Sequence, residues 1–436
     1  MLTRYDAIYT LALPALAPYL LWRRLARGKY ADSAGGMMGR RLPSADEARK
    51  FGAGSLWVHA VSVGEIAAAR AVVPGLRRLA PELPLVVSTI TETGQAAARQ
   101  AFPEAASTYF PADFSPNVRR FQDAYNPRLF VLLETELWPN FLAMAAARGT
   151  GCYMLNGKLS DRSFPRYRKF RNFLAPALGA LSGVCTQTDE DARRFEALGI
   201  DPARIRVTGN CKFDLAQKPL TPEERRELVA ELGLTPRRWI VAGSTHPGEE
   251  TAILAAFSRL THSSKSAIRN PQSTIGLLLC PRHPERFDEV VRLAWQAGLR
   301  TARASAPEPQ SDPEVVVLDR MGVLARAYGL GEVAIVAGSF CAVGGHNLLE
   351  AAAHAVPVVF GPDMHSQREL DRLFKQAGAG IQVRADALAD TLAKLLNDEA
   401  YRRAEGEKGR AVLERNQGSA ARAIDAMRGW LEASDR

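Results

Sequence analysis

Short apolar runs alternate with longer Ala-rich or amphipathic stretches over residues 56–214. A run of about four to eight apolar residues bounded by turn residues is typical of a buried strand, and each stretch that follows has the length of a helix. Strands that alternate with helices imply right-handed crossovers and a parallel sheet. The sequence therefore predicts a first sheet, with strands from residue 56 and at residues 84–90, 108–111, 128–134, 151–156, 183–187 and 205–208.

The alternation lapses after Asp214 and then starts again. Residues 217–225 are polar and contain two prolines, which is typical of a domain boundary. Beyond it the pattern predicts a second parallel sheet, polar loops at residues 261–274 and 301–313, and three helical stretches from about residue 386. The strands expected in this sheet are residues 239–244, 275–280, 315–318, 333–337 and 356–360.

These patterns predict an α/β protein of two doubly wound domains that face each other across a cleft lined by strand-end loops. The first domain is expected over residues 31–215 and the second over residues 216–436, with last helices that could pack back on the first domain. A length of 436 residues agrees with this, because it is too long for one compact core.

An apolar stretch at residues 7–22 precedes the first domain and is followed by Arg23, Arg24, Arg27 and Lys29. It is slightly short for a spanning helix, and a signal peptide would carry its positive charge before the apolar run. We expect residues 1–30 to form a membrane-associated segment at the cytoplasmic leaflet. The alternative is an N-terminal helix that packs on the protein itself.

The formal net charge of +9 is concentrated at the N-terminal end, where residues 1–50 hold nine Lys or Arg against four Asp or Glu. This concentration indicates an acidic surface or substrate that meets the N-terminal part of the protein. The five cysteines are scattered without metal-ligand spacing, and reduced thiols in a cytoplasmic protein are the simplest account.

A glycine turn at residues 62–64 joins the first predicted strand to a helix and places Glu65 at the start of that helix. Ligands of open α/β sheets bind at the carboxyl ends of strands. The helix dipole favours an ionised carboxylate there, and such a carboxylate can serve as a general base. The alternative is an ordinary first-turn residue, which is a common use of Glu.

Glu134 and Glu136 end the most apolar strand of the first domain. Burying a carboxylate at this position is costly unless it has a partner. Lys212, which ends the last strand of the same sheet, could supply that partner.

A glycine-rich loop, Gly344–Gly345, follows a strand in the second domain, and a helix is expected to open near Asn347. Glycines let the backbone approach a ligand, and a helix N-terminus offers N–H groups to phosphate. The alternative is a tight turn without a ligand. Glu350 fits a capping box with Asn347, and it could also accept hydrogen bonds from ribose hydroxyls.

Pro281-Arg282-His283-Pro284 also follows a predicted strand. Arg282 is expected to point into the cleft, where its guanidinium could bind a phosphate or carboxylate in a bidentate way. His283 is either a phosphate donor or a structural histidine.

Aromatic and basic residues interleave over residues 164–173. Such a segment suits a phosphorylated lipid headgroup or a membrane surface, although RNA could be bound in the same way and a solvated helix face is the plain alternative. The candidate contacts are Arg166, Arg168, Lys169 and Arg171.

Eight motifs in order along nearly the whole chain resemble the family of 3-deoxy-D-manno-octulosonic acid (Kdo) transferases of Gram-negative lipopolysaccharide synthesis. They are HAVSVGE at residues 59–65, TxTG at 91–94, LLETELWPN at 132–140, TGNCKFD at 208–214, STHPGEE at 244–250, PRHPERF at 281–287, GGHNLLEAAAHAVPV at 344–358 and FGP at 360–362.

The resemblance implies a GT-B fold and an inverting glycosyltransferase that moves Kdo from CMP-Kdo to a phosphorylated lipid A precursor, lipid IVA, at the cytoplasmic face of the inner membrane. It implies no metal, no cofactor and no nucleic acid. Glu65 would be the general base, and Glu134 and Lys212 would stabilise the transition state. CMP would be held by Pro281, Arg282, Met321, Gly322, Val323, Asn347, Leu348, Leu349 and Glu350.

Two positions depart from the family pattern. Val323 stands where the family usually has Glu, which puts a side-chain contact to the nucleotide in doubt. Leu348 stands where the family has Pro, and we expect this change to be tolerated if the backbone carries the contact. The competing interpretation is a GT-B-fold nucleotide-sugar-binding or epimerase-like protein without Kdo transfer, but it leaves the retained Glu65, Glu134 and Lys212 without a purpose.

Overall fold

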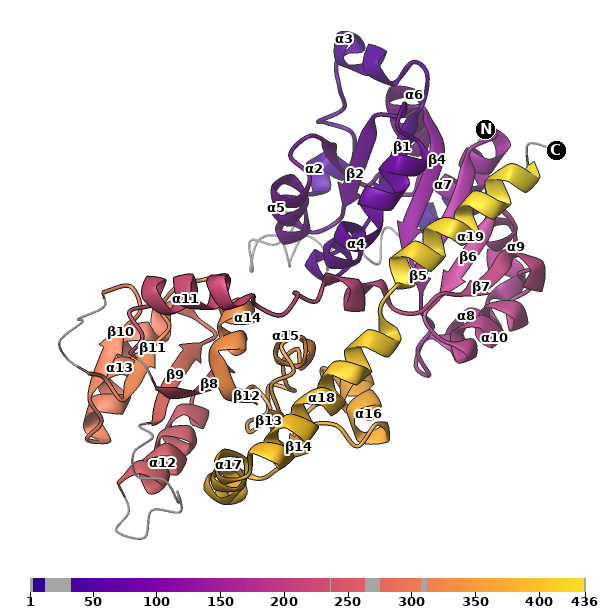
Figure 1. The fold of residues 1–436 in the computed structure, drawn as a ribbon. Coiled ribbons are helices and arrows are strands. Elements are labelled where there is room, and N and C mark those ends of the chain that lie inside the picture. Colours follow the sequence, from indigo (N-terminus) through magenta and orange to yellow (C-terminus); the bar gives the residue numbers. More distant parts are fainter. Residues whose placement is uncertain (1–2, 12–32, 236, 263–274, 307–311, 435–436) are drawn as a thin grey trace. The chain divides into compact units, whose positions relative to one another are not determined.

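The computed structural model describes residues 3–11, 33–235, 237–262, 275–306 and 312–434. The chain divides into two compact units, Met1–Leu215 with Asn416–Arg436, and Ala216–Arg415. Each unit is built on a seven-stranded sheet whose paired strands are all parallel (Figure 1). The α/β class and the two parallel sheets expected from the sequence are therefore confirmed.

The sheet of the first unit has the strand order β3-β2-β1-β4-β5-β6-β7. Its strands are β1 Ser55–His59, β2 Leu85–Thr89, β3 Ala106–Tyr109, β4 Pro127–Leu133, β5 Gly151–Gly157, β6 Gly183–Thr186 and β7 Ile205–Val207. Its helices are α2 Ser33–Met37, α3 Ala45–Ala48, α4 Val63–Leu79, α5 Glu92–Ala101, α6 Ser115–Tyr125, α7 Pro139–Ala147, α8 Phe164–Lys169, α9 Arg171–Gly179, α10 Asp189–Ala197 and α19 Ser419–Ser434, with 3₁₀ turns η1 Arg49–Phe51, η2 Pro202–Arg204 and η3 Cys211–Leu215.

The sheet of the second unit has the order β10-β11-β9-β8-β12-β13-β14. Its strands are β8 Arg238–Thr245, β9 Ile275–Pro281, β10 Thr301–Arg303, β11 Val315–Val317, β12 Gly331–Val336, β13 Val358–Phe360 and β14 Ile381–Gln382. Its helices are α11 Pro222–Glu231, α12 Glu249–Thr261, α13 Phe287–Gln296, α14 Leu324–Ala327, α15 Leu349–Ala352, α16 Arg368–Gln376, α17 Leu388–Asn397 and α18 Glu399–Asn416, with 3₁₀ turns η4 Pro284–Arg286, η5 Tyr328–Leu330 and η6 Ala385–Ala387.

The sequence did not predict the two edge strands of the second sheet, β10 and β14. They are three and two residues long, and all their residues are partly exposed. A strand of this kind needs no apolar run, so hydrophobic patterning could not reveal it. The central strands β1 and β9, by contrast, are buried along their whole length and were found from the sequence.

The order of strands reverses between β1 and β4 in the first sheet, and between β8 and β12 in the second. In doubly wound sheets ligands bind outside the carboxyl ends of the strands that flank such a reversal. The loops after β1 and β4 carry Glu65 and Glu134, and the loop after β12 carries the glycine-rich stretch. The topology thus places the candidate residues of each unit where a ligand site is expected.

The last helix of the chain, α19, packs on the first unit (Figure 1). The Trp430 ring stacks on Tyr153 with centroids 6.1 Å apart, and Ile424 lies so close to Gly75 of α4 that an added Cβ would come within 2.6 Å of it. The C-terminal residues therefore complete the core of the first sheet.

Residues 4–11 form a helix, and most of the apolar stretch expected to anchor the protein, residues 12–22, lies outside the described residues. Within the part that is described, the chain contains no helix long and apolar enough to cross a membrane. Tyr5 and Asp6 are buried against the first unit, whereas Ile8 and Leu11 are 45% and 80% exposed. Part of the expected membrane segment is thus a packed element of the fold, because polar contacts hold residues 3–9 in place.

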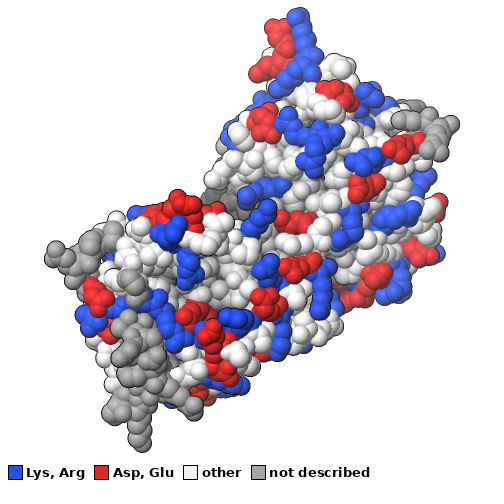
Figure 2. All heavy atoms as spheres, viewed as in Figure 1, with Lys and Arg blue, Asp and Glu red and all other residues white. Residues whose placement is uncertain are grey.

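On the face drawn in Figure 2, Lys and Arg side chains are interspersed with Asp and Glu. This face therefore carries no continuous basic surface of the kind that binds a nucleic-acid backbone.

Candidate active site and nucleotide pocket

Glu65 lies in the first turn of α4, directly after the loop that follows β1. Its Oε2 accepts a hydrogen bond from the Val61 backbone N–H at 2.7 Å. The pKa of Glu65 is raised to about 7, mainly by burial and also by Glu134 and Glu136, against the opposing effects of the Val61 N–H and Lys212. The helix dipole was expected to favour the ionised form of this group, but the net effect of its surroundings is a raised pKa, with burial as the main cause.

The loop after β4 supplies the other carboxylate. Lys212 Nζ lies 2.6 Å from Glu134 Oε1, so the partner expected for Glu134 is present, and both side chains remain partly exposed. Glu134 has a positive φ of 58°, a conformation that costs a non-glycine residue free energy and is often found at functional sites. In this conformation its side chain reaches the turn that carries Lys212.

Asn156 at the end of β5 fixes that turn, although sequence reasoning did not single it out. Its Oδ1 accepts a hydrogen bond from the Cys211 N–H at 2.9 Å, and its φ is also positive, at 61°. A buried Asn at the end of an apolar strand is the signal that could have identified it. Glu65, Glu134 and Lys212 thus come from three separate loops of the first sheet, with Glu136 close enough to affect the pKa of Glu65.

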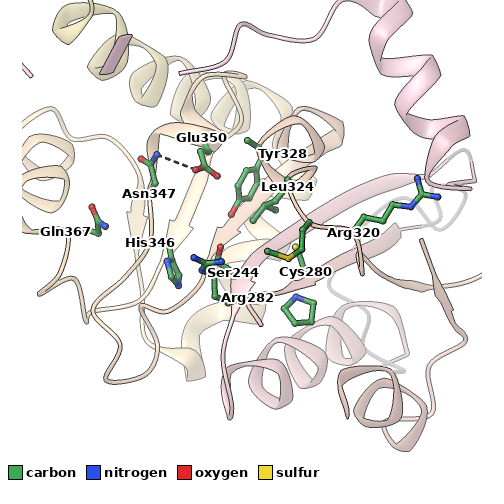
Figure 3. Close-up of a pocket in the computed structure, with 14 residues that line it drawn as sticks. Ser244, Cys280, Arg282, Arg320, Leu324, Tyr328, His346, Asn347, Glu350 and Gln367 are labelled. Atoms are coloured by element: carbon green, nitrogen blue, oxygen red, sulfur yellow. Dashed lines mark hydrogen bonds between the residues drawn. The ribbon is translucent and has the colours of Figure 1, made fainter. Parts of the chain in front are cut away.

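The second unit contains a pocket of about 360 Å³ at the carboxyl ends of its strands (Figure 3). The lining comes from the ends of β8 and β9 with the residue after β9, from the segment 320–328, from the loop after β12 with α15, and from the residue before α16. The lining residues are Ser244, Cys280, Pro281, Arg282, Arg320, Met321, Gly322, Leu324, Ala325, Tyr328, His346, Asn347, Glu350 and Gln367.

Most of the residues expected to hold the nucleotide line this pocket, but Val323, Leu348 and Leu349 do not. Leu348 and Leu349 have buried side chains, and the Leu349 N–H already donates to Asn347 Oδ1 at 3.1 Å. Asn347 also donates through Nδ2 to Glu350 Oε1 at 3.5 Å, as the dashed line in Figure 3 marks.

The helix expected to open near Asn347 is α15, which begins at Leu349 and has four residues, so its dipole offers little to a phosphate. The charge available to an anion is that of Arg282, because Arg320 pairs with Glu231 at 3.2 Å. Arg282 forms no ion pair with any residue the structure describes, and its backbone N–H donates to Thr245 O at 3.0 Å.

Three further residues shape the pocket and were missed from the sequence. Glu249 accepts hydrogen bonds from the backbone N–H groups of His246, Gly338 and Phe340, and so ties the loops after β8 and β12 together. Tyr328 fills the space that Gly243 leaves free, since an added Cβ would lie 2.0 Å from its hydroxyl.

His346 is the third missed residue, and it pairs with His246. Their Nε2 atoms are 2.9 Å apart, so one ring donates to the other. Burial lowers the pKa of His346 to about 4, with His246 and Arg282 adding to the effect. Both rings are therefore neutral near pH 7 and leave Arg282 as the fixed charge beside them. His283 lies edge-on to His246 and does not line the pocket.

The basic segment keeps its side chains at the surface of the first unit. Arg166, Arg168 and Lys169 lie on α8 and Arg171 begins α9, all exposed and without an ion pair to any described residue. Within the described residues no group of three or more His, Cys, Asp or Glu is arranged to hold a metal ion.

Arg282→Ala is expected to weaken CMP binding by about 10- to 100-fold, the usual value of a hydrogen bond to a charged group. Thermal stability should be nearly unchanged, because the side chain is exposed and unpaired. Calorimetric titration with CMP measures the first effect, and Arg292→Ala, an equal loss of charge on α13, is the matched control. Equal CMP affinity in wild type and Arg282→Ala would contradict the placement of the nucleotide.

Comparison with known proteins gives a consistent result over the whole chain. A family model described as 3-Deoxy-D-manno-octulosonic-acid transferase (kdotransferase) matches residues 33–215. The 3-deoxy-D-manno-octulosonic acid transferase of Bordetella pertussis is 35% identical over 441 residues, covering 97% of this chain and 99% of that protein. The protein of the same name from Haemophilus influenzae is 32% identical over 387 residues, covering 86% of this chain and 87% of that protein.

Solved structures that are similar at low identity support the fold alone. A putative UDP-N-acetylglucosamine 2-epimerase from Listeria monocytogenes has a TM-score of 0.56 at 13% identity, covering 87% of this chain and 97% of that one. A glycosyltransferase from Rickettsia africae has a TM-score of 0.53 at 13% identity, covering 87% and 98%. The architecture is GT-B-like, and because one neighbour is an epimerase, the fold does not choose the reaction.

Proposed function

This chain belongs to the family of 3-deoxy-D-manno-octulosonic acid transferases, glycosyltransferases of lipopolysaccharide core biosynthesis that move Kdo from CMP-Kdo, and we propose that its acceptor is the phosphorylated lipid A precursor lipid IVA. The observation that best supports a catalytic role is the carboxylate of Glu65. It is buried beside the Glu134–Lys212 ion pair, with a pKa near 7, where a general base works well at neutral pH.

In the proposed reaction Glu65 takes the proton of an acceptor hydroxyl as the oxygen attacks the anomeric carbon of Kdo. The bond from that carbon to the CMP phosphate breaks on the opposite face, so the configuration inverts. Positive charge develops on the sugar, and the carboxylate of Glu134 stabilises it, held in place by Lys212. The proton ends on Glu65 and the electron pair on the departing phosphate.

The pocket of the second unit is proposed to hold CMP. Arg282 would offset the charge of the phosphate, and Glu350 would accept hydrogen bonds from the ribose hydroxyls. Burial raises the pKa of Glu350, with Asn347 and Arg282 opposing the rise, which suits a carboxylate that a ribose would cover. Transfer further requires the two units to face each other across a cleft, as proposed for a GT-B enzyme.

Purified protein, CMP-Kdo and lipid IVA, with CMP release and the mass of the lipid product both measured, test this function. The expected result is CMP release that depends on the acceptor, with a product heavier by Kdo. CMP release without a change in the lipid would exclude transfer, and no turnover with intact CMP binding would favour a nucleotide-sugar-binding protein.

Peripheral association with the cytoplasmic face of the inner membrane is proposed from the surface around the N-terminal helix. Arg4 donates to the backbone oxygen of Phe173 at 3.1 Å, so this helix adjoins the basic segment. Phe170, Ile8 and Leu11 are among the large apolar side chains that remain exposed. Exposed cations and apolar side chains together suit an anionic lipid surface.

Deletion of residues 12–22 is expected to move the protein from membranes to the soluble fraction, because it removes the apolar stretch of the anchor. Turnover of detergent-dispersed acceptor should be kept, since residues 3–11, which pack on the first unit, remain. A deletion that starts at residue 2 would remove the buried Tyr5 and Asp6 and is expected to destabilise the fold.

Fractionation of membranes at low and high salt measures the attachment of the 12–22 deletion variant. If this variant still binds membranes at low salt and is released at high salt, the anchor is the basic segment alone.

A further inference from the structure

Residues 3–11, here called the N-terminal strut, make buried polar contacts with two helices of the first unit. Asp6 is 1% exposed, and its carboxylate accepts hydrogen bonds from the N–H and hydroxyl of Ser115, at 2.8 and 2.5 Å, and from Asn140 Nδ2 at 3.0 Å. Ser115 is the first residue of α6, and Asn140 lies in the first turn of α7. The strut therefore contacts the start of both helices.

A second buried carboxylate, Asp113, holds the start of α7 itself. It accepts hydrogen bonds from the backbone N–H groups of Asn140 and Phe141, at 3.0 and 2.8 Å, and from the hydroxyl of Tyr9 at 3.1 Å. The Asn140 side chain is enclosed by the strut as well, because its Oδ1 accepts from the Thr3 hydroxyl. Tyr9 and Thr3 thus complete the polar shell around the N-terminus of α7.

Some helices of this protein are capped by the side chain of the residue that precedes them, and others, such as α4 and α12, have no side-chain cap. Thr91, Thr188 and Thr221 each cap the helix that follows them with their own side chain, whereas α6 and α7 have no local side-chain cap. Asp6 and Asp113 replace it, and neither carboxylate forms an ion pair with a described residue. Burial raises the pKa of Asp113 to about 7, with a smaller contribution from Asp6, so the Asp113 carboxylate is costly to place at the start of α7.

The position of α7 matters because the catalytic loop leads into it. The β4–α7 loop, residues 134–138, begins with Glu134 and ends at Trp138, the residue before α7. One end of this loop is fixed by β4 in the middle of the sheet. The other end is fixed by the start of α7, and therefore by Asp113, Asn140 and the strut.

We propose that Tyr9 and Asp6 are positioning residues for Kdo transfer, which act through Asp113 and Asn140 on the β4–α7 loop and so hold Glu134 in place beside Glu65. The inference rests on the catalytic role proposed for Glu134. It assigns to the strut an effect on turnover that is separate from membrane attachment, although the rest of the apolar stretch, residues 12–22, follows the strut directly in the sequence.

Tyr9→Phe tests the proposal, with Tyr5→Phe as the matched control on the same helix. Each change removes one hydroxyl. Tyr9→Phe removes the hydrogen bond from the Tyr9 hydroxyl to Asp113. Tyr5→Phe removes the hydrogen bond that the Tyr5 hydroxyl donates to the Phe173 backbone oxygen at 2.7 Å and the one that it accepts from Arg4 at 3.2 Å. Both variants are expected to lose a similar amount of thermal stability. Only Tyr9→Phe should lower kcat, by roughly 10-fold, with KM for CMP-Kdo unchanged, since a 1 Å misplacement of a reacting group can cost about 100-fold.

Measurements are made on detergent-dispersed acceptor, well below both melting temperatures. Equal kcat in the two variants would overturn the proposal and leave the strut a structural element. Thr3→Val, which removes the hydroxyl bonded to Asn140, serves as the second variant if Tyr9→Phe does not fold, and it is expected to act in the same direction.

A double-mutant cycle with Glu134→Gln separates this inference from the proposed mechanism. If the strut acts through Glu134, Tyr9→Phe should lower kcat far less in the Glu134→Gln background than in wild type. An equal loss of kcat in both backgrounds would contradict the proposal that the strut acts through the β4–α7 loop. Normal turnover of Glu134→Gln alone would instead remove Glu134 from the mechanism, whatever the effect of Tyr9→Phe.

Discussion

Glu65→Gln is expected to lower kcat for Kdo transfer by about 10²- to 10⁴-fold, the usual loss when a general base is removed. The amide has nearly the shape of the carboxylate and can still accept the hydrogen bond from the Val61 N–H, so the loop before α4 should keep its conformation. It cannot take a proton from the acceptor hydroxyl. Transfer kinetics measure the loss, and calorimetric titration should show unchanged CMP affinity, because the pocket proposed to hold CMP lies in the other unit.

The pH profile of the wild-type enzyme is part of the same prediction. A general base works when it is deprotonated, and burial raises the pKa of Glu65 to about 7. Activity should therefore be level above this pH and fall by about tenfold for each pH unit below it. This fall of activity below pH 7, the acid limb of the profile, should be absent from the residual activity of Glu65→Gln. Near-normal turnover in the variant, or an unchanged acid limb, would exclude Glu65 as the base.

Glu134→Gln is expected to lower kcat by about 10²- to 10³-fold, the range found when one preorganised electrostatic contact to a transition state is removed. The substitution takes away the carboxylate proposed to stabilise charge on the sugar, and it leaves Lys212 without its partner. It should also shift the acid limb to lower pH, because the Glu134 carboxylate raises the pKa of Glu65. The pH dependence of kcat/KM reports both effects in one experiment.

Glu136→Gln is the control for this experiment, since Glu136 lies in the same loop and also raises the pKa of Glu65. It should move the acid limb in the same direction but lower the rate on the plateau above about pH 7 much less than Glu134→Gln does. If the two variants lower the plateau rate equally, the effect belongs to the loop as a whole and the specific role of Glu134 is wrong.

Hydrophobic patterning located the central strands because those strands are buried on both faces. Such strands read as unbroken apolar runs, and β4 and β9 are examples. Parallel strands also bring the residues that follow them to one edge of the sheet. The motifs that contain Glu65, Glu134 and Lys212 could therefore be expected to lie close together. The family resemblance and its order of motifs were likewise readable from the sequence alone.

Features that depend on contacts between distant segments could not be read in this way. The edge strand β14 pairs with β13 through two residues only, too few to leave a pattern. The burial of the Leu348 and Leu349 side chains, which the family resemblance places at the nucleotide site, is another such feature.

The sequence by itself determined the fold class, the family and the candidate carboxylates, because each is encoded by residues that are neighbours in the chain. Only the tertiary structure decided that the pKa of Glu65 is raised, since burial and the charges of Glu134 and Lys212 act through space. It also decided that Asp6 and Asp113 hold the start of α7. The contact of Asp6 with Asn140 joins residues that are more than 100 positions apart in the sequence. Burial and charge at a site are properties of the surroundings, and those surroundings exist only once the chain has folded.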